Sequence, residues 1–116
     1  MQRATWPLKT KKMKCFEDNK GRIIRLTDER LVHLETHHPE MSGQLPRISD
    51  TIISPDRVVR SKTDASVELV YKHYPATPVT EKFLCIVVKT TGEDHFIVTA
   101  YYTDSLKGGA LLWEKR

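Results

Sequence analysis

The alternation of apolar and polar residues changes character along the chain, and each change marks a different kind of predicted element. Two short runs, at residues 13–16 and 22–26, flank the turn sequence Asp18-Asn19-Lys20-Gly21. This arrangement predicts a hairpin or an irregular pair of strands near the N-terminus. After residue 56 the apolar positions recur at every second residue, which predicts four strands at 57–61, 67–74, 83–89 and 95–103.

Two helices are predicted between the hairpin and the four strands. Thr27 is suited to cap the first helix, and two acidic residues follow it at the positive end of the helix dipole. This helix should end at residue 37 or 38, because Pro39 restricts the residue before it. A second helix is expected at 44–53, with the apolar stripe Leu45, Ile48, Ile52 and Ile53.

The connections between the four strands are short, which favours an antiparallel meander, and the helices must then cover one face of it. The sequence therefore predicts an α+β fold in which two N-terminal helices pack on a four-stranded antiparallel sheet, with a short N-terminal hairpin. Residues 13–116 would form this single domain, and residues 1–12 a poorly ordered basic N-terminus. The C-terminal segment 111–113 is expected to pack back onto the domain.

The last of the four predicted strands has two different faces. Phe96, Val98 and Ala100 are expected to face the helices. The alternate positions, which are His95, Ile97, Thr99 and Tyr101, would lie on the more open face of the sheet. A polar, aromatic and basic sheet surface is the kind of platform on which unstacked nucleic-acid bases can lie.

Composition and charge narrow the class of protein. The chain has 116 residues, of which 39% are hydrophobic and 29% charged, so it suits one globular domain and is too apolar for a disordered protein. Its formal net charge of +4 is compatible with a polyanionic partner without demanding one. There is no secretory signal and no apolar run long enough to span a membrane. Cys15 and Cys85 suggest neither a disulfide framework nor a zinc site, so we expect a cytoplasmic protein.

Histidines are the first candidates for chemistry. His33 and His37 are four residues apart on the first predicted helix, so both rings could reach one metal ion. A zinc site needs further ligands, and the Glu that usually follows the first histidine is absent. We therefore expect no metal and no cofactor, although a metal-dependent hydrolase that uses these two residues stays open.

Metal-free cleavage of RNA needs a group that removes the 2′-hydroxyl proton and a group that protonates the leaving 5′-oxygen. Histidine suits both tasks because its unperturbed pKa of ~6.5 is close to neutral pH. Arginine, lysine and hydroxyl groups suit the charge that develops on phosphorus. The side chains that could supply these groups are His33, His37, His38, Arg60, Tyr71, Lys82, Thr99 and Tyr101.

Each of these residues also has a purely structural interpretation. His38 could simply close the first helix by a hydrogen bond, and His37 could face solvent without a role. Arg60 could be an ordinary charge on an edge strand. Thr99 and Tyr101 could be present because such residues favour strands.

Six segments give the sequence a resemblance to a known family. They are LTDERLVHL at 26–34, HHPE at 37–40, IISPDRV at 52–58, LVYK at 69–72, FLCIVV at 83–88 and FIVTAY at 96–101. In this order they resemble the phage-associated nucleases of the barnase–EndoU–colicin–RelE-like (BECR) superfamily. The similarity covers roughly residues 22–113.

The resemblance implies helices followed by a four-stranded antiparallel sheet, and a metal-independent endoribonuclease of a phage, mobile-element or toxin–antitoxin system. By position it implies His33, His38 and Thr99 as catalytic residues, with Arg60 as the phosphate-binding cation and Tyr71 as the phenol. Lys82, Tyr101 and His37 would then contact the substrate.

The partners expected on this basis are RNA and a cognate antitoxin or immunity protein, with no membrane. The oligomeric state stays open. A non-catalytic module that binds RNA or protein on the same face is the alternative.

Overall fold

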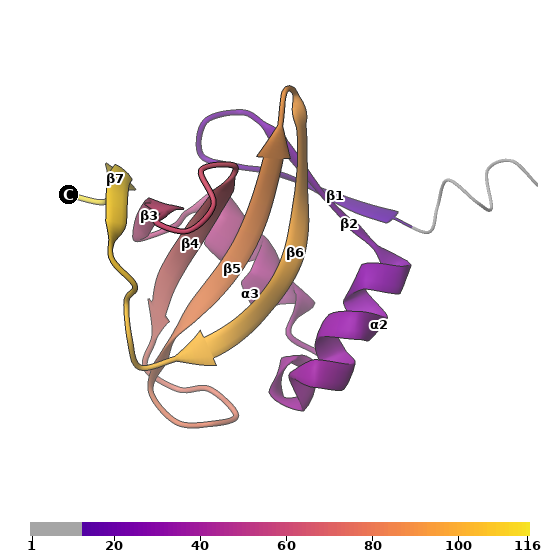
Figure 1. The fold of residues 1–116 in the computed structure, drawn as a ribbon. Coiled ribbons are helices and arrows are strands. Elements are labelled where there is room, and N and C mark those ends of the chain that lie inside the picture. Colours follow the sequence, from indigo (N-terminus) through magenta and orange to yellow (C-terminus); the bar gives the residue numbers. More distant parts are fainter. Residues whose placement is uncertain (1–12) are drawn as a thin grey trace, which may run out of the picture.

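The computed structural model describes residues 13–116, so the expected basic N-terminus at residues 1–12 lies outside the described residues. The described chain forms two layers, a sheet and a helical layer (Figure 1). The sheet contains β1 (Met13–Glu17), β2 (Ile23–Thr27), β3 (Arg57–Ser61), β4 (Val67–Tyr74), β5 (Lys82–Thr91), β6 (Asp94–Thr103) and β7 (Gly109–Glu114). The helical elements are α2 (Asp28–His37), the short 3-10 helix η2 (Pro39–Met41) and α3 (Leu45–Ile53).

The sheet corrects the predicted fold. Its described strands number seven, in the order β1-β2-β6-β5-β4-β3-β7, and β2 pairs with β6 in parallel, so the prediction of a four-stranded antiparallel sheet was wrong. The central meander from β3 to β6 is present as expected. The N-terminal hairpin, however, extends the sheet beside β6, and the C-terminal segment extends it beside β3. The overall class remains α+β.

Local sequence accounts for the boundaries of α2. The Thr27 hydroxyl accepts a hydrogen bond from the backbone N–H of Arg30 at 3.1 Å, which confirms the predicted cap. At the other end, the N–H of His38 donates to the carbonyl of Leu34 at 2.7 Å, and Pro39 then begins η2. The helix therefore ends at His37, where the proline predicts it.

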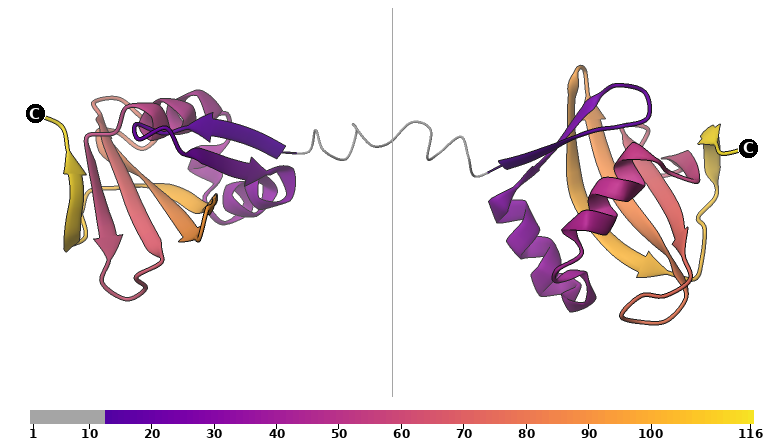
Figure 2. Two further views of the ribbon diagram at one scale, coloured as in Figure 1. Left: turned by 90° about the horizontal axis from the view of Figure 1, so that it is seen from above. Right: turned by 180° about the vertical axis from the view of Figure 1, so that it is seen from behind.

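The helical layer covers one face of the sheet and leaves the other open (Figure 2). The main core lies between the two layers and includes Leu34 of α2, Ile48 and Ile52 of α3, and Ile86 of β5. A smaller apolar cluster lies on the open face, where Val59, Leu69, Tyr71 and Cys85 are buried. The two faces of the central strands are thus both apolar near the middle of the sheet.

A β-bulge in β6 changes which residues reach the core. Val88 pairs with Ile97 and Val87 pairs with Thr99, so Val98 is an extra residue between two paired positions. As a result Ile97 is buried in the core with 1% of its surface exposed, whereas Phe96 and Val98 are only partly buried. The expectation that Phe96 and Val98 face the helices and Ile97 the open side was therefore wrong.

The helices in the described part of the chain are too short or too polar to cross a membrane.

Candidate active site

The helix α2 lies beside the lower half of β6 (Figure 1). Arg30, His33 and His37 of α2 form a border there with Val98 and Thr99 of β6. A hollow of about 240 Å³ lies along this border. Three histidines line it, His33, His37 and His38, together with Arg30 and Thr99. The structure therefore brings together four of the candidate residues, which are His33, His37, His38 and Thr99.

The position of His38 is fixed by the elements on either side of it. Leu34 and Met41, three or four residues away along the chain, are both buried in the core, with 2% and 0% of their surfaces exposed. The carbonyl of His38 accepts a hydrogen bond from the N–H of Met41 at 2.9 Å. These contacts hold the backbone of the turn while the imidazole stays partly exposed at the edge of the open face.

Two side chains, those of Glu40 and Tyr101, lie close to the imidazole of His38. Its Nδ1 atom lies 3.7 Å from a carboxylate oxygen of Glu40, so Nε2 is the ring nitrogen left for other partners. Its ring also contacts the ring of Tyr101, with centroids 5.5 Å apart and the planes tilted by 57°. Tyr101 belongs to β6, so this contact joins the end of α2 to the open face of the sheet.

His33 and His37 stack on each other. Their ring centroids are 5.9 Å apart and their planes differ by 7°. Nδ1 of His37 lies 2.9 Å from the carbonyl oxygen of His33, so that nitrogen carries a proton and donates to the backbone. Among residues 13–116 no three His, Cys, Asp or Glu side chains gather closely enough to hold a metal ion. Within this part of the chain, the two histidines have no further ligand of the kind that a metal centre uses.

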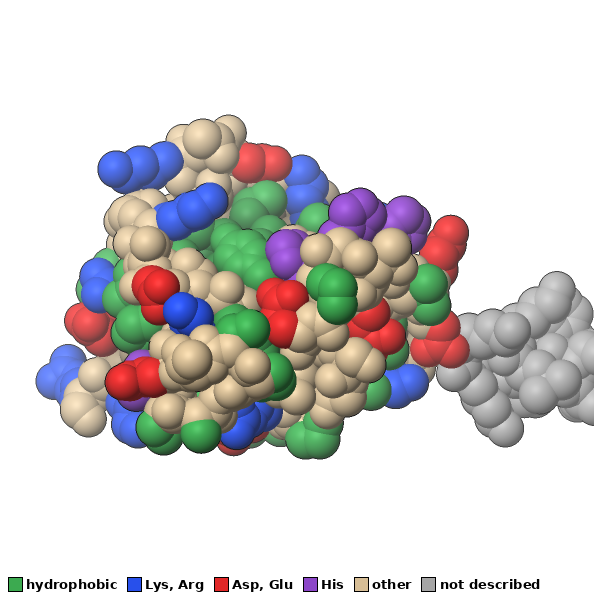
Figure 3. Space-filling model, turned by 90° about the horizontal axis from the view of Figure 1, so that it is seen from below, with side chains coloured by type: hydrophobic (Ala, Val, Ile, Leu, Met, Phe, Trp, Pro, Cys, Tyr) green, Lys and Arg blue, Asp and Glu red, His purple; other side chains and the backbone are tan. Residues whose placement is uncertain are grey.

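A second, larger hollow continues the first across the open face. It has a volume of about 470 Å³, and its floor consists of Val67, Leu69, Val87 and Tyr101. Because Tyr101 also contacts His38, the two hollows adjoin at this tyrosine. Figure 3 shows this face with apolar side chains in the depression, histidine on one side of it and lysine or arginine on the other.

Two lysines border the larger hollow on the side away from the histidines. Lys62 belongs to the β3–β4 turn, and Lys107 belongs to the segment 104–108 that joins β6 to β7, which we call the strap. Neither ammonium group is paired with a carboxylate of the described residues, in contrast to Lys82 and Lys89. These two lysines were missed by the sequence interpretation. The Lys-Gly-Gly run at 107–109, four residues beyond the end of the Thr-Ala-Tyr strand, could have pointed to Lys107.

Tyr71 has a different position from the expected one. Its side chain is fully buried beneath the larger hollow, so it cannot stack on a base. Its hydroxyl oxygen instead accepts a hydrogen bond from the backbone N–H of Lys107 at 3.0 Å. Tyr71 therefore holds the strap against the sheet.

Burial also raises the pKa values of three groups in and beneath the floor of the larger hollow. It raises the pKa of Tyr71 to about 12 and the pKa of the Cys85 thiol to about 11. The pKa of Tyr101 is raised as well, mainly by burial. All three groups are neutral at pH 7, so the floor of the hollow carries no charge that would repel a phosphate.

Arg60 is not part of this arrangement. It pairs with Glu68 across the β3–β4 ladder, and strand alternation places both on the face that Val58 shares with the helices. The carboxylate of Glu68 binds the guanidinium of Arg22 through two hydrogen bonds of 3.1 and 2.7 Å. The structure thus separates Arg60 from Tyr71, which faces the open side.

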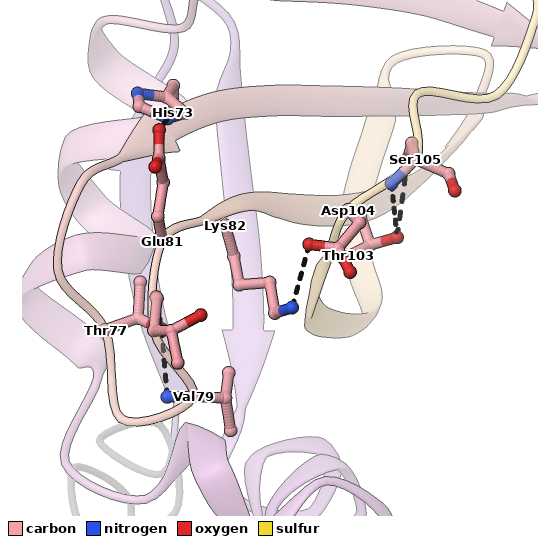
Figure 4. Close-up of polar contacts among 9 residues, drawn as sticks. His73, Thr77, Val79, Glu81, Lys82, Thr103, Asp104 and Ser105 are labelled. Atoms are coloured by element: carbon pink, nitrogen blue, oxygen red, sulfur yellow. Dashed lines mark hydrogen bonds and ion pairs between the residues drawn. The ribbon is translucent and has the colours of Figure 1, made fainter.

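Lys82 belongs to a separate polar cluster near the β4–β5 loop (Figure 4). Its ammonium group lies 2.8 Å from a carboxylate oxygen of Asp104. In the same cluster Nε2 of His73 lies 2.7 Å from a carboxylate oxygen of Glu81. The hollow that these residues share has a volume of about 230 Å³, and the residues that line it do not include those around His38. Lys82 is thus not brought to the histidines of α2.

Comparison with known proteins identifies one family. A family model described as phage-Barnase-EndoU-ColicinE5/D-RelE like nuclease2 matches residues 7–114 of the chain. No curated protein and no solved structure gives a match.

Proposed function

Since the chain belongs to the phage-Barnase-EndoU-ColicinE5/D-RelE like nuclease2 family, we propose that it is a metal-independent endoribonuclease that cleaves RNA by acid–base catalysis on the open face of the sheet. One observation carries the proposal. His38 lines one hollow together with His33 and Thr99. On its other side its ring contacts Tyr101, which lines a second hollow bordered by two lysines.

The proposed reaction uses the 2′-hydroxyl of the substrate as the nucleophile. One imidazole removes the 2′-hydroxyl proton while O2′ forms a bond to phosphorus. The bond from phosphorus to O5′ breaks, and an imidazolium donates its proton to that leaving oxygen. The products are a 2′,3′-cyclic phosphate and a 5′-hydroxyl, and the reaction consumes no water, oxidant or reductant at this step.

His38 and His33 are the residues assigned to these proton transfers. Nε2 of His38 is available because its other ring nitrogen faces Glu40. His33 is exposed in the same hollow, and its stacking partner His37 limits the orientations of its ring and can contact the substrate. Histidine is the residue that most often performs such transfers near neutral pH.

The charge that develops on the phosphate needs hydrogen-bond donors and cations. Thr99 lies in the histidine hollow and can donate its hydroxyl proton to a non-bridging oxygen. Lys62 and Lys107 lie across the larger hollow and can hold the neighbouring phosphates of the RNA strand. In this arrangement the two lysines have the phosphate-binding role that was expected of Arg60 and Lys82.

A toxin role in a phage, mobile-element or toxin–antitoxin system is part of the same proposal. A ribonuclease with its active site on an open sheet face is harmful to the cell that makes it unless a partner covers that face. A cognate antitoxin or immunity protein with acidic groups opposite Lys62, Lys107 and Arg30 would complement the site electrostatically. Expression of the wild-type chain should then arrest growth, and His38→Ala should relieve the arrest.

The direct test is cleavage of labelled single-stranded RNA by the purified chain in the presence of EDTA. We expect cleavage with cyclic-phosphate ends, no cleavage when the nucleotide at the cut site lacks its 2′-hydroxyl, and a loss of about 10²-fold or more in kcat/KM for His38→Ala and for His33→Ala. His73→Ala is the matched control, because this histidine belongs to the cluster of Figure 4.

Each alternative predicts a different result. Unchanged cleavage in both His33→Ala and His38→Ala would remove the assigned roles, and a loss confined to His73→Ala would move the site to the cluster of Figure 4. Activity that disappears with EDTA would favour a metal-dependent enzyme. Salt-dependent RNA binding without any product would favour a non-catalytic binding module.

A further inference from the structure

The larger hollow on the open face has the form of a ligand site. Its volume of about 470 Å³ falls within the range of ~300–1,000 Å³ that is usual for small-molecule sites. Val67, Val87 and Tyr101 on its floor are only partly buried, so apolar surface remains exposed to water there. Covering such surface is favourable, which makes the hollow a place for a flat apolar group.

The rim of the hollow is polar, unlike its floor. The hydroxyl of Ser61, at the end of β3, lies 3.1 Å from the hydroxyl of Thr63 in the following turn, and both residues line the hollow. Asp64 lines the same side, and hydrogen bonds from Ser66 and Lys89 hold its carboxylate in place. A ligand with apolar faces and hydrogen-bonding edges therefore matches the floor and the rim together.

Cations mark where the charged part of such a ligand would lie. Lys62 and Lys107 approach the hollow from two segments that pack together, since a Cβ atom built on Gly108 would lie 3.3 Å from Cε of Lys62. Neither lysine has a carboxylate partner within residues 13–116, so both are available for an anion. A planar ring with polar edges, joined to an anionic group, is the chemistry of a nucleotide.

The position of Tyr101 connects the hollow with the histidines. Its ring forms part of the floor and lies 5.5 Å, between centroids, from the ring of His38. A nucleotide within RNA has a phosphate on each side of its ribose, so a base placed on this floor could leave one phosphate beside the imidazole and the other beside the lysines. An unstacked base can reach such a position, whereas a base inside a duplex cannot.

We infer that the hollow between the β3–β4 turn and the strap is a pocket for one unpaired nucleobase of the RNA, adjacent to the phosphate at which His38 acts. This inference rests on the proposed function and adds to it that the substrate is single-stranded at the cut site. It also implies that one base next to the cleaved bond contributes to binding more than the others do.

The test combines a change in the pocket with a change in the substrate. An oligoribonucleotide with one mapped cut site is prepared in versions that lack the base at each position around that site. Base removal at a single position should lower kcat/KM of the wild-type chain by roughly 10- to 100-fold, the usual worth of one stacked base. Val87→Trp, which fills the hollow, should cause a similar loss on the intact RNA and no further loss on the RNA without that base.

Ile53→Trp is the matched control because Ile53 is 52% exposed at the end of α3, in the helical layer. It should cleave both RNAs as the wild type does. The base pocket would be refuted if the losses from Val87→Trp and from base removal were additive. It would also be refuted if base removal had no effect on cleavage at any position. Neither result would count against the proposed nuclease activity. Absence of any cleavage by the folded wild type would instead count against the proposed function.

A binding measurement decides the inference even if Val87→Trp does not fold or no RNA is cleaved. Nucleoside 5′-monophosphates and ribose 5-phosphate are titrated separately into the wild-type chain labelled at its methyl groups. At least one nucleotide should shift the methyl resonances of Val67, Leu69 and Val87, and ribose 5-phosphate should not. Shifts that are equal for the two classes, or that are absent from these methyl groups for all nucleotides, would refute a base pocket.

Discussion

Removal of one oxygen atom from Tyr71 should affect both stability and substrate binding. The Tyr71 side chain is fully buried, and its hydroxyl accepts the backbone N–H of Lys107 in the strap. Tyr71→Phe keeps the ring and loses this hydrogen bond, which contributes about 1 kcal/mol. The N–H of Lys107 then has to find water, so the total loss should be about 1–2 kcal/mol, or a decrease in Tm of roughly 4–8 °C for a domain of this size.

The kinetic effect follows from the place of Lys107. If about 1 kcal/mol holds the strap in position over the hollow, its loss should raise KM for RNA up to about fivefold and leave kcat nearly unchanged. Tyr102→Phe is the matched control. Tyr102 is also buried, and its hydroxyl donates to Gln44 at 2.5 Å, but it faces the helical layer. Its loss should lower Tm by a similar amount without changing KM.

The two variants are compared by thermal unfolding and by steady-state cleavage of the same RNA. The reasoning fails if both variants lower Tm and neither changes KM, because the Tyr71 hydroxyl would then not control the strap. It also fails if both raise KM equally, since the effect would then come from general loosening of the domain.

Further predictions concern stability and pH. Gly109→Ala should destabilise the domain by roughly 1–3 kcal/mol, because a Cβ atom there would lie 2.1 Å from a carbonyl oxygen of β3; an unchanged Tm would contradict this. Glu68→Gln should cost about 1.5–3 kcal/mol in urea unfolding, since it weakens the charged hydrogen bonds to Arg22, and a cost under about 0.5 kcal/mol would refute it. Hydrogen bonds from Ser66 lower the pKa of Asp64 from 3.8 to about 2, so its stabilising effect is present above pH 4 and is lost as pH falls through 2. Acid titrations of wild type and Asp64→Asn should therefore converge below pH 2, and parallel curves would exclude this linkage.

The central elements of the fold could be predicted because their signals are local. Strands β3 and β4 occupy the predicted residues, and α2 begins at its predicted cap and ends before Pro39. The places of β1, β2 and β7 could not be predicted in the same way. A strand is added to a sheet edge by backbone hydrogen bonds between distant segments, and a short run such as Gly109–Glu114 does not specify which edge it joins.

The candidate site was predictable to the extent that its residues lie on one element or next to a strong break. His33 and His37 share a helix face, and Pro39 fixes the end of that helix beside His38. Residues on different strands were harder to group, because the face of each depends on the register of its ladder. Arg60 and Tyr71 illustrate this, since the observed β3–β4 register places Arg57, and not Arg60, opposite Tyr71.

The β-bulge at Val98 was not predicted, and it decides which residues of β6 border the candidate site. Strict alternation through β6 would place Val98 in the core and Ile97 on the open face. The extra residue instead lets Ile97 fill the core, while Val98 and Thr99 both line the histidine hollow beside α2. Thr99 and Tyr101 keep the period of two beyond the bulge, so both reach the open face with Val87 and Cys85 opposite them. Bulges are often found at functional sites, and here the bulge turns Val98 toward the histidines of α2 instead of into the core. Ile97 and Thr99 would share one face of a regular strand, so the extra residue lets β6 fill the core at Ile97 and still place Thr99 and Tyr101 on the open face, where Tyr101 contacts His38.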